Sequence, residues 1–507
     1  MTEPAQTVFE AFSAAALRDP GKTAIVFDSR AISYAEVMAR VETVSRNLAA
    51  RRIAKGSVFA AYSPNRPELM YCYYAAARLG AVFVPVNPNL TPPEVAHTYR
   101  HSGAKLLFCD DSLADIAAAA VPDGMLFSLD DLCASAPSLP DLPQATVEPE
   151  DDFLIIYTSG TTGTPKAIVL DHAAQTNGPR ALAEMWGVSD RDTTVVALPL
   201  GYLYGLSTAA AVGLQTGGTV VILRRFHPRD VLEALITHRA SIYHGVPTMY
   251  SMMLEYCEQR DLTFDLSHVR VLVAAGSPLA TEARQRFYAR FGAELQNYYA
   301  MTESTPVFGK LAQDPHPMPE DAVGRAAPGL QVRIVRPDGT DCADDEEGEI
   351  LVRAAATMRC YLKSPELTAA AFRDGLFGTG DLGRRDGDGN YFITGRIKDI
   401  IIRGGANISP AEVEAALVKH PAVQDVAVVG APDRIFGEVP AAFIVLRAGQ
   451  SAGAEDLAAY AAMTLSDFKV PRRYHFEVSL PIGKTGKIDK AALARRLADE
   501  AAVDAKR

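Results

Sequence analysis

The chain has 507 residues, of which 48% are hydrophobic and 22% are charged, and its formal net charge is −11. Because domains usually span ~100–200 residues, this length predicts two or more domains around a large buried core. The acidic balance argues against a nucleic-acid-binding protein, which would show a basic stripe, although a single site for an anionic ligand could still be locally positive.

Strand and helix patterns alternate through the first part of the chain. The apolar run Ser57–Tyr62 predicts a buried strand, Pro67–Leu79 has helical spacing, and Ala81–Pro85 is again strand-like. Such strand–helix–strand units build parallel sheets that are covered by helices. Further strand candidates are 105–109, 152–157, 194–198, 219–223 and 269–274.

The pattern changes near residue 390. From there on, short strands and helices predict a separate α+β domain of about a hundred residues. We therefore expect an α/β fold with a large N-terminal domain of helix-covered sheets, residues 1–396, and a small C-terminal domain, residues 397–507. Beyond residue 390, the strand candidates are 391–395, 399–402 and 423–429, and the helix candidates are 410–419 and 454–466.

A segment rich in glycine and hydroxyl side chains directly follows the strand candidate 152–157. Its glycines let backbone N–H groups close around phosphate oxygens, its hydroxyls add donors, and its final lysine supplies positive charge. A flexible surface loop is the alternative, but it does not account for the Pro-Lys end. The segment reads Tyr157-Thr158-Ser159-Gly160-Thr161-Thr162-Gly163-Thr164-Pro165-Lys166, which is not the spacing of a Walker A loop.

Together with three later motifs, this segment resembles the adenylate-forming superfamily of acyl-CoA synthetases, adenylation domains and firefly luciferase. The resemblance covers about residues 32–487, and the motifs occur in the family's order. It implies an AMP-forming acid–thiol ligase that uses ATP, Mg²⁺ and coenzyme A and forms an acyl-AMP intermediate. The later motifs are Tyr299-Ala300-Met301-Thr302-Glu303, Gly378-Thr379-Gly380-Asp381 and Thr485-Gly486-Lys487.

The resemblance assigns roles around the nucleotide. Tyr299 is expected to stack on adenine, Thr302 to contact the α-phosphate and Asp381 to accept the ribose hydroxyls, while Glu303 is the expected metal ligand. A carboxylate beside a triphosphate needs such a cation between them. The expected catalytic residues are Lys487, Thr162, Glu303 and Lys166, and the expected ATP/AMP-binding residues are Thr158, Ser159, Gly160, Thr161, Thr162, Gly163, Tyr299, Thr302, Asp381 and Arg396.

Lys487 is expected to be the adenylation lysine, which stabilises the charge that builds as the carboxylate attacks the α-phosphate. In relatives the small domain is mobile and then rotates, which withdraws this lysine and opens a thiol tunnel. Lys398 lies at the expected hinge, and Arg403, Gly404 and Gly405 are the expected tunnel residues. Paired glycines suit close passage of a pantetheine arm, although a simple glycine turn is the alternative interpretation.

The expected acyl pocket departs from common family patterns. Gly201 and Tyr202 stand where many relatives have a phenylalanine–histidine pair, and Tyr298 and Ala300 stand where many have glycine. This added bulk predicts a compact acid: short, branched, cyclic or small aromatic. For the tyrosines and His244, ordinary packing is the alternative. The expected pocket residues are Tyr202, Tyr204, His244, Gly245, Ala275, Ser277, Tyr298 and Ala300.

Coenzyme A is the expected acceptor, and the alternative is a free-standing adenylation enzyme that loads a carrier-protein thiol. The segment from Leu198 to Leu206 has no acidic residue to hold an ammonium group, which disfavours amino-acid activation. A non-catalytic scaffold of this fold would be free to lose the motif residues, which are all present.

The remaining expectations concern location and partners. The six cysteines form no Cys-x-x-Cys pair, and scattered thiols are typical of a reducing compartment. Residues Met1 to Phe12 lack the pattern of a signal peptide, and no stretch approaches the ~18 apolar residues of a membrane span. The sequence therefore predicts a cytoplasmic enzyme that acts on a small carboxylic acid and has no nucleic-acid partner and no membrane span. It does not indicate the oligomeric state.

Overall fold

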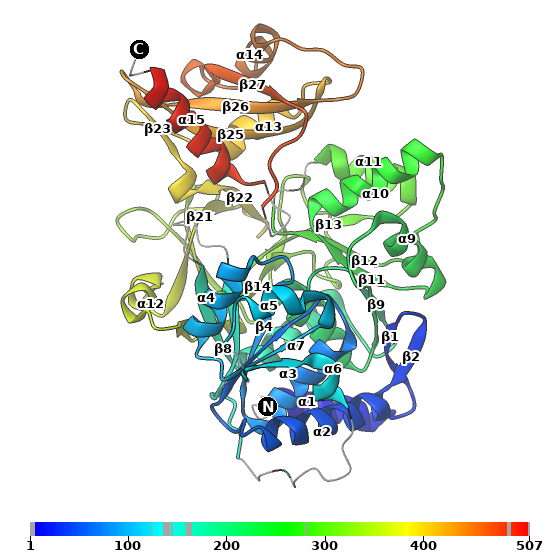
Figure 1. The fold of residues 1–507 in the computed structure, drawn as a ribbon. Helices are drawn as coiled ribbons and strands as arrows, with labels where there is room; N and C mark the ends of the chain where they lie inside the picture. Colours follow the sequence, from blue (N-terminus) through cyan, green and yellow to red (C-terminus); the bar gives the residue numbers. More distant parts are fainter. Residues whose placement is uncertain are drawn as a thin grey trace. The chain divides into compact units, whose positions relative to one another are not determined.

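The computed structural model contains two compact units, residues 1–331 with 352–377 and residues 332–351 with 378–507 (Figure 1). Both units combine helices and sheets, and the larger one is N-terminal, which confirms the predicted fold class. These two compact units do not meet at residues 396/397, where the sequence analysis places the domain boundary. That boundary was assigned as a hinge between moving domains, and it stays a prediction. The structure describes residues 6–504 except 123, 135–141, 143–145, 159–164, 278, 280 and 484–487.

A seven-stranded sheet in the first unit has the order β19-β8-β7-β4-β3-β5-β6. Its centre is parallel and built from the predicted strand–helix–strand unit, in which α3 spans Pro67–Leu79 as expected. The helix starts with proline at its first turn and ends at Gly80, whose positive φ of 64° suits glycine. The strands are β3 (Val58–Tyr62), β4 (Val82–Val86), β5 (Leu106–Cys109), β6 (Leu126–Ser128), β7 (Asp152–Thr158), β8 (Lys166–Asp171) and β19 (Cys360–Tyr361).

A ten-stranded sheet in the same unit has the order β15-β14-β13-β12-β11-β9-β10-β1-β2, with β18 paired to β14. The strand candidates 194–198, 219–223 and 269–274 are confirmed as β9, β10 and β12. The strands are β1 (Thr23–Phe27), β2 (Arg30–Ser33), β9 (Thr193–Val196), β10 (Thr219–Ile222), β11 (Ile242–Gly245), β12 (Val271–Ala275), β13 (Leu295–Met301), β14 (Ser304–Gly309), β15 (Arg325–Ala326) and β18 (Ala356–Thr357).

Alternate residues of this sheet face two separate hydrophobic clusters. Tyr243 and Leu272 belong to the cluster with helices α9 (Pro228–Thr237), α10 (Pro247–Arg260) and α11 (Thr281–Phe291). The residues next to them in sequence, Ile242, Val271 and Val273, belong to the cluster on the other side of the sheet. Helix α7 (Ala174–Trp186) and the π-helix η2 (Tyr204–Ala211) also contribute side chains to that cluster. A π-helical turn is rare and frequently marks a functional site.

The second unit holds two smaller sheets. One contains β16 (Gln331–Val335), β17 (Gly348–Arg353), β21 (Leu376–Arg385) and β22 (Tyr391–Arg396), and the other has the order β24-β23-β26-β25 with β27 beside β26. The candidate strand 399–402 begins later than expected, because residues Ile397–Asp399 form a 3₁₀ turn. The second sheet and its helices comprise β23 (Ile401–Arg403), β24 (Ala406–Ile408), β25 (Val423–Asp433), β26 (Gly437–Leu446), β27 (Arg473–Glu477), α13 (Pro410–Leu417), α14 (Ala454–Ala462) and α15 (Lys490–Asp504).

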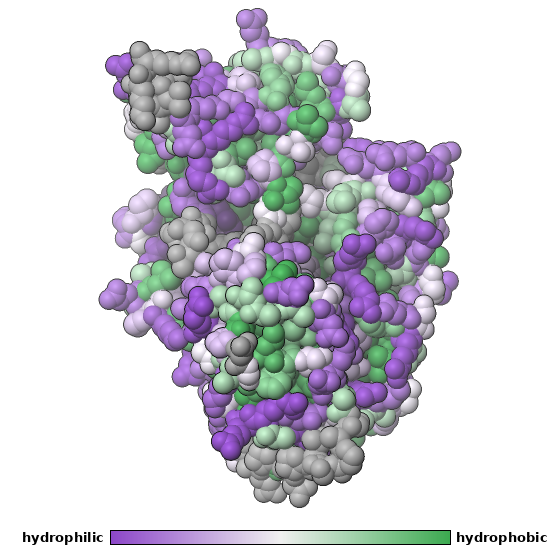
Figure 2. All heavy atoms as spheres, in the orientation of Figure 1, coloured by the Kyte–Doolittle hydropathy of each residue, from purple (hydrophilic) through white to green (hydrophobic). Residues whose placement is uncertain are grey.

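Hydrophilic side chains dominate the face of the molecule in Figure 2, and hydrophobic ones form separate patches between them. Within the described residues, no helix combines the length and the apolar character that a membrane crossing requires.

Candidate active site

Two predicted nucleotide residues, Lys166 and Glu303, lie against one tyrosine. The Tyr361 hydroxyl donates a hydrogen bond to Glu303 Oε1 over 3.0 Å, and Lys166 Nζ lies 4.8 Å from the centroid of the Tyr361 ring. Burial, and then the neighbouring Glu303 carboxylate, raise the pKa of the Tyr361 phenol, so the hydroxyl keeps its proton and remains a donor. The sequence analysis missed Tyr361, because only strand pairing brings it to this place.

The ends of the predicted phosphate loop are held side by side. Thr158 closes β7 and Lys166 opens β8, and the two are direct partners in the antiparallel ladder. The predicted residues Ser159, Gly160, Thr161, Thr162 and Gly163 lie outside the described residues, as does the predicted adenylation residue Lys487.

The motif at 299–303 occupies the β13–β14 hairpin. Tyr299 pairs with Phe308 across the ladder, and their rings are nearly parallel, with centroids 5.6 Å apart and an interplanar angle of 19°. Thr302 and Glu303 lie at the turn that follows β13. One hairpin thus carries the residues expected at adenine, α-phosphate and metal.

Glu303 has the chemistry of a magnesium ligand. Among the described residues, no group of three or more His, Cys, Asp or Glu side chains could hold a metal ion by itself. Mg²⁺ does not require such a cage, because it commonly takes one or two carboxylates and completes its shell with phosphates and waters. A half-buried carboxylate with one oxygen fixed by a phenol fits that role.

In the second unit, the structure brings two of the predicted nucleotide-binding residues together. Asp381 on β21 and Arg396 on β22 are partners in the ladder, and Arg396 Nε donates to Asp381 Oδ1 over 2.7 Å. The Asp381 carboxylate is buried, and its backbone N–H donates to Thr379 Oγ1 over 3.0 Å. The side chain of Asp381 is therefore held in place before any ligand binds.

The predicted hinge and tunnel residues flank the next strand of this unit. Lys398 lies in the exposed 3₁₀ turn between β22 and β23. Gly404 has a φ of +57°, and its N–H donates to the Phe436 carbonyl over 2.8 Å. A Cβ at Gly404 would lie 3.3 Å from Phe436 Cδ1, while the Arg403 guanidinium lies 4.8 Å from the centroid of that ring. Gly405 also has a positive φ, of 88°.

Most of the predicted acyl-pocket residues gather on the α7 side of the ten-stranded sheet. The His244 ring lies 5.0 Å from the Trp186 ring and 5.8 Å from the Tyr204 ring, and the Tyr298 ring lies 5.1 Å from Trp186. Ala275 and Ala300 belong to the hydrophobic cluster on this side of the sheet. The Tyr204 hydroxyl donates a hydrogen bond to the Gly245 carbonyl over 3.3 Å. Ser277 directly follows β12 in the chain. These side chains form an aromatic wall, which we define as Trp186, Tyr204, His244 and Tyr298.

The polar groups of the aromatic wall differ in whether they have hydrogen-bond partners. The Tyr298 hydroxyl hydrogen-bonds to Thr305 Oγ1 at 2.9 Å, so it is paired within the protein. His244 is buried, its Nδ1 has no hydrogen-bond partner, and burial lowers its pKa to about 3. The imidazole is therefore neutral at physiological pH.

Tyr202 has a different environment from the wall. It lies beside Asn87, and burial raises the pKa of its phenol. The preceding Gly201 packs against the same residue so closely that a Cβ would lie 2.7 Å from Asn87 Cα. A phenylalanine at position 201 would not fit this backbone contact, which explains one departure from the family pattern.

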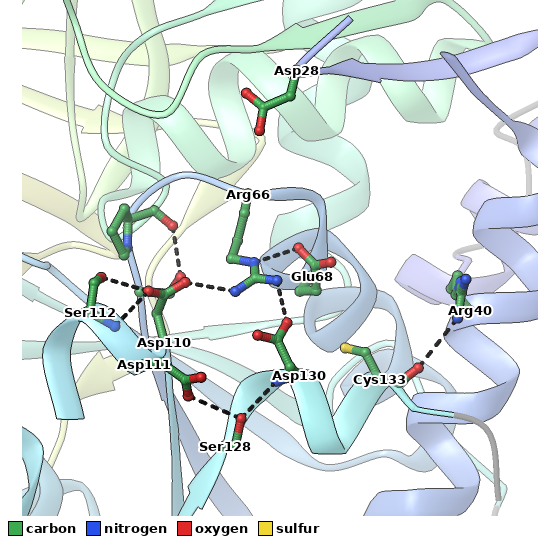
Figure 3. A network of polar contacts seen from close by, with 12 residues as sticks. Asp28, Arg40, Arg66, Glu68, Asp110, Asp111, Ser112, Ser128, Asp130 and Cys133 are labelled. Atoms are coloured by element: carbon green, nitrogen blue, oxygen red, sulfur yellow. Dashed lines mark hydrogen bonds and ion pairs between the residues drawn. The ribbon is translucent and has the colours of Figure 1, made fainter. Parts of the chain in front are cut away.

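A dense charged cluster elsewhere in the first unit has a structural role (Figure 3). Arg66 precedes α3 and forms ion pairs with Glu68 at 2.7 Å, with Asp110 at 2.6 Å and with Asp130. The three carboxylates follow β3, β5 and β6, at the carboxyl edge of the seven-stranded sheet. One guanidinium holds three carboxylates, so the cluster ties the start of α3 to the segments that follow β5 and β6.

Comparisons with known proteins match nearly the whole chain to one group of enzymes. Residues 12–362 match the model of the AMP-binding enzyme family, and residues 412–487 match that of the AMP-binding enzyme C-terminal domain. A feruloyl-CoA synthase of Amycolatopsis is 36% identical over 94% of this chain and 96% of its own length. An indoleacetate–CoA ligase of Aromatoleum aromaticum is 34% identical over 93% of this chain and 94% of its own. Long-chain-fatty-acid–CoA ligases also match, at 30% and 32% identity.

Solved structures extend the likeness to the whole fold. The crystal structure of ATP-bound MatB from Rhodopseudomonas palustris superposes with a TM-score of 0.88 at 31% identity, covering 97% of this chain and 99% of that one.

Proposed function

The chain belongs to the family of AMP-binding enzymes, and from this premise we propose that it activates a compact aromatic carboxylic acid for transfer to coenzyme A. ATP-dependent acid–CoA ligation is the reaction of this enzyme and of its relatives. The identity of the acid is the proposal. The observation that carries it is the aromatic wall, whose four rings follow one another in three contacts: Tyr204 with His244, His244 with Trp186, and Trp186 with Tyr298.

The reaction has two steps. A carboxylate oxygen of the acid attacks the α-phosphorus of ATP, and pyrophosphate leaves with the electron pair of the broken P–O bond. The thiolate of coenzyme A then attacks the activated carbonyl carbon, and AMP leaves. The protein's task is to position the reactants and to stabilise charge, because no covalent intermediate with the chain is needed.

The motif residues fit these steps. Lys166 and the segment before it would bind the phosphates, Tyr299 the adenine, and Asp381 the ribose hydroxyls, while Lys487 would bridge the reacting carboxylate and phosphate. Glu303 would hold Mg²⁺, which supplies charge neutralisation for the triphosphate when bound.

The aromatic wall limits the pocket in length and favours flat substrates. Tyr298 is 3% exposed and pinned through its hydroxyl to Thr305, so it cannot swing aside to admit a long chain at low cost. Aromatic rings pack well against flat aromatic ligands. The names of two relatives, which specify ferulate and indoleacetate, support an aryl acid, whereas the long-chain relatives define the alternative.

A panel of acids tests the proposal. Pyrophosphate release would be measured with benzoate, arylacetate, cinnamate, C3–C8 and C16 acids, each with coenzyme A, with a phosphopantetheinylated carrier protein, or with neither. We expect the highest kcat/KM for an aryl acid and a thioester with coenzyme A. A higher kcat/KM for the C16 acid than for the aryl acids would refute the compact pocket. A thioester formed on the carrier protein and not on coenzyme A would refute coenzyme A as the acceptor.

Trp186 offers an independent readout. It is the single tryptophan of the chain and part of the aromatic wall. Binding of a preferred acid in the presence of ATP should therefore change its fluorescence, and an acid that is not activated should leave it unchanged.

A further inference from the structure

A short segment, residues 356–362, joins the two large sheets of the first unit; we call it the strap. Its first end, β18, pairs with β14, where Thr357 faces Ser304, the residue directly after Glu303. Its other end, β19, pairs with β8, where Tyr361 faces Ile168 close to Lys166. The strap thus touches both sheets at the points where two predicted ATP-site residues stand.

Backbone hydrogen bonds reinforce both ends of the strap. Met358 N–H donates to the Glu303 carbonyl over 2.7 Å, and Leu362 N–H donates to the Ala167 carbonyl over 2.8 Å. The Tyr361 N–H donates to Thr368 Oγ1 over 2.9 Å, which fixes the backbone that carries the ring.

The Tyr361 side chain bridges groups of opposite charge. Its hydroxyl donates to Glu303 Oε1 over 3.0 Å, and its ring faces Lys166 Nζ at 4.8 Å. A carboxylate beside a triphosphate is repelled unless a cation intervenes, and a phenol donor limits the directions in which it can turn. A lysine has a flexible four-carbon stem, and an aromatic face attracts its ammonium group and restricts it.

We propose that Tyr361 is a positioning residue for the adenylation step, which holds Glu303 ready for Mg²⁺ and Lys166 ready for the ATP phosphates. This inference rests on the proposed function, in which Glu303 and Lys166 have those roles. Outer partners of metal ligands typically contribute 10–100-fold to metal affinity, so the effect of losing the hydroxyl should be measurable.

Two substitutions separate the two contacts. Tyr361→Phe removes the hydroxyl from Glu303 and keeps the ring beside Lys166, whereas Tyr361→Leu removes both. Tyr460→Phe is the matched control, because the Tyr460 hydroxyl donates to the Lys419 carbonyl over 2.9 Å at an exposed position in the second unit.

Metal and nucleotide binding are measured directly as well as through activity. Electron paramagnetic resonance with Mn²⁺ and ATP reports the affinity for the metal–nucleotide complex, and titration of ATP in EDTA reports binding without metal. Pyrophosphate release at a range of Mg²⁺ concentrations gives the apparent KM for the metal. Thermal unfolding shows whether each variant folds.

Tyr361→Phe should bind Mn²⁺–ATP about tenfold more weakly, with ATP binding in EDTA unchanged and with activity restored by high Mg²⁺. Tyr361→Leu should weaken ATP binding in EDTA as well, because Lys166 is also released. Wild-type metal affinity in Tyr361→Phe would overturn the inference, as would an activity loss that Mg²⁺ does not restore. If the wild-type enzyme and Tyr460→Phe failed to bind Mn²⁺–ATP, the proposed function itself would be wrong.

Discussion

Acid should destabilise the first unit through the buried histidine of the aromatic wall. Burial lowers the pKa of His244 to about 3, whereas an unfolded histidine titrates near 6.5. Between these values the unfolded chain binds a proton that the folded chain does not, so stability falls as the pH drops below about 6.5. At pH 5, one and a half pH units below that value, His244 lowers the free energy of unfolding by about 2 kcal/mol, at ~1.4 kcal/mol per pH unit.

A second buried histidine adds to the effect. Burial lowers the pKa of His172 to about 4, which contributes another loss of about 2 kcal/mol over the same range. Urea denaturation followed by the fluorescence of Trp186 measures the stability of the first unit at each pH, because that tryptophan is buried in this unit and reports its unfolding. The wild-type protein should lose about 4 kcal/mol from these two groups between pH 7 and 5, and His244→Phe should lose about 2 kcal/mol less than the wild type.

An equal acid sensitivity in His244→Phe and wild type would refute this reasoning, because it would mean that His244 is solvated or already protonated when folded. A larger sensitivity in the variant would contradict the sign of the shift.

Three further substitutions test the site. Asp381→Asn should weaken AMP binding roughly 10–100-fold in calorimetry, since a hydrogen bond to a charged acceptor is worth about 1.5–3 kcal/mol; unchanged affinity would remove Asp381 from the ribose site. Gly404→Val places a side chain at φ +57° against Phe436, so coenzyme A-dependent turnover should fall at least about tenfold while acid-dependent pyrophosphate exchange persists; equal loss of both would contradict a tunnel role. Glu414→Gln removes the carboxylate that lies 2.6 Å from Lys490 Nζ at the start of α15, so the second unit should lose about 1–3 kcal/mol in urea denaturation, and full retention would show that the pair is not stabilising.

Local patterns predicted the elements well, because periodicity of apolar residues is a property of neighbouring positions. The range Pro67–Leu79 is helical from end to end, and Asp152–Tyr157 is a strand that continues by one residue. The 3₁₀ turn at Ile397–Asp399 was missed, since a three-residue turn leaves no periodic signal.

Site residues within one motif, or in motifs of a familiar order, could be predicted. Asp381 was expected at the ribose and Arg396 at the ribose or phosphate of the same nucleotide, and the ladder places the two residues side by side. Tyr361 could not be found in this way, because its contacts come from the antiparallel pairing of β19 with β8. The roles assigned to all of these site residues, including the segment 159–163 and Lys487, remain predictions.

The most direct test of the account is a single-turnover experiment with a preferred aryl acid, ATP and Mg²⁺, in which acyl-AMP and acyl-CoA are quantified by mass spectrometry before and after coenzyme A is added. The account predicts acyl-AMP and pyrophosphate in amounts close to that of the enzyme, followed by conversion to acyl-CoA and AMP. Formation of ADP and phosphate in place of AMP and pyrophosphate, or a thioester formed with no acyl-AMP before it, would contradict the central claim.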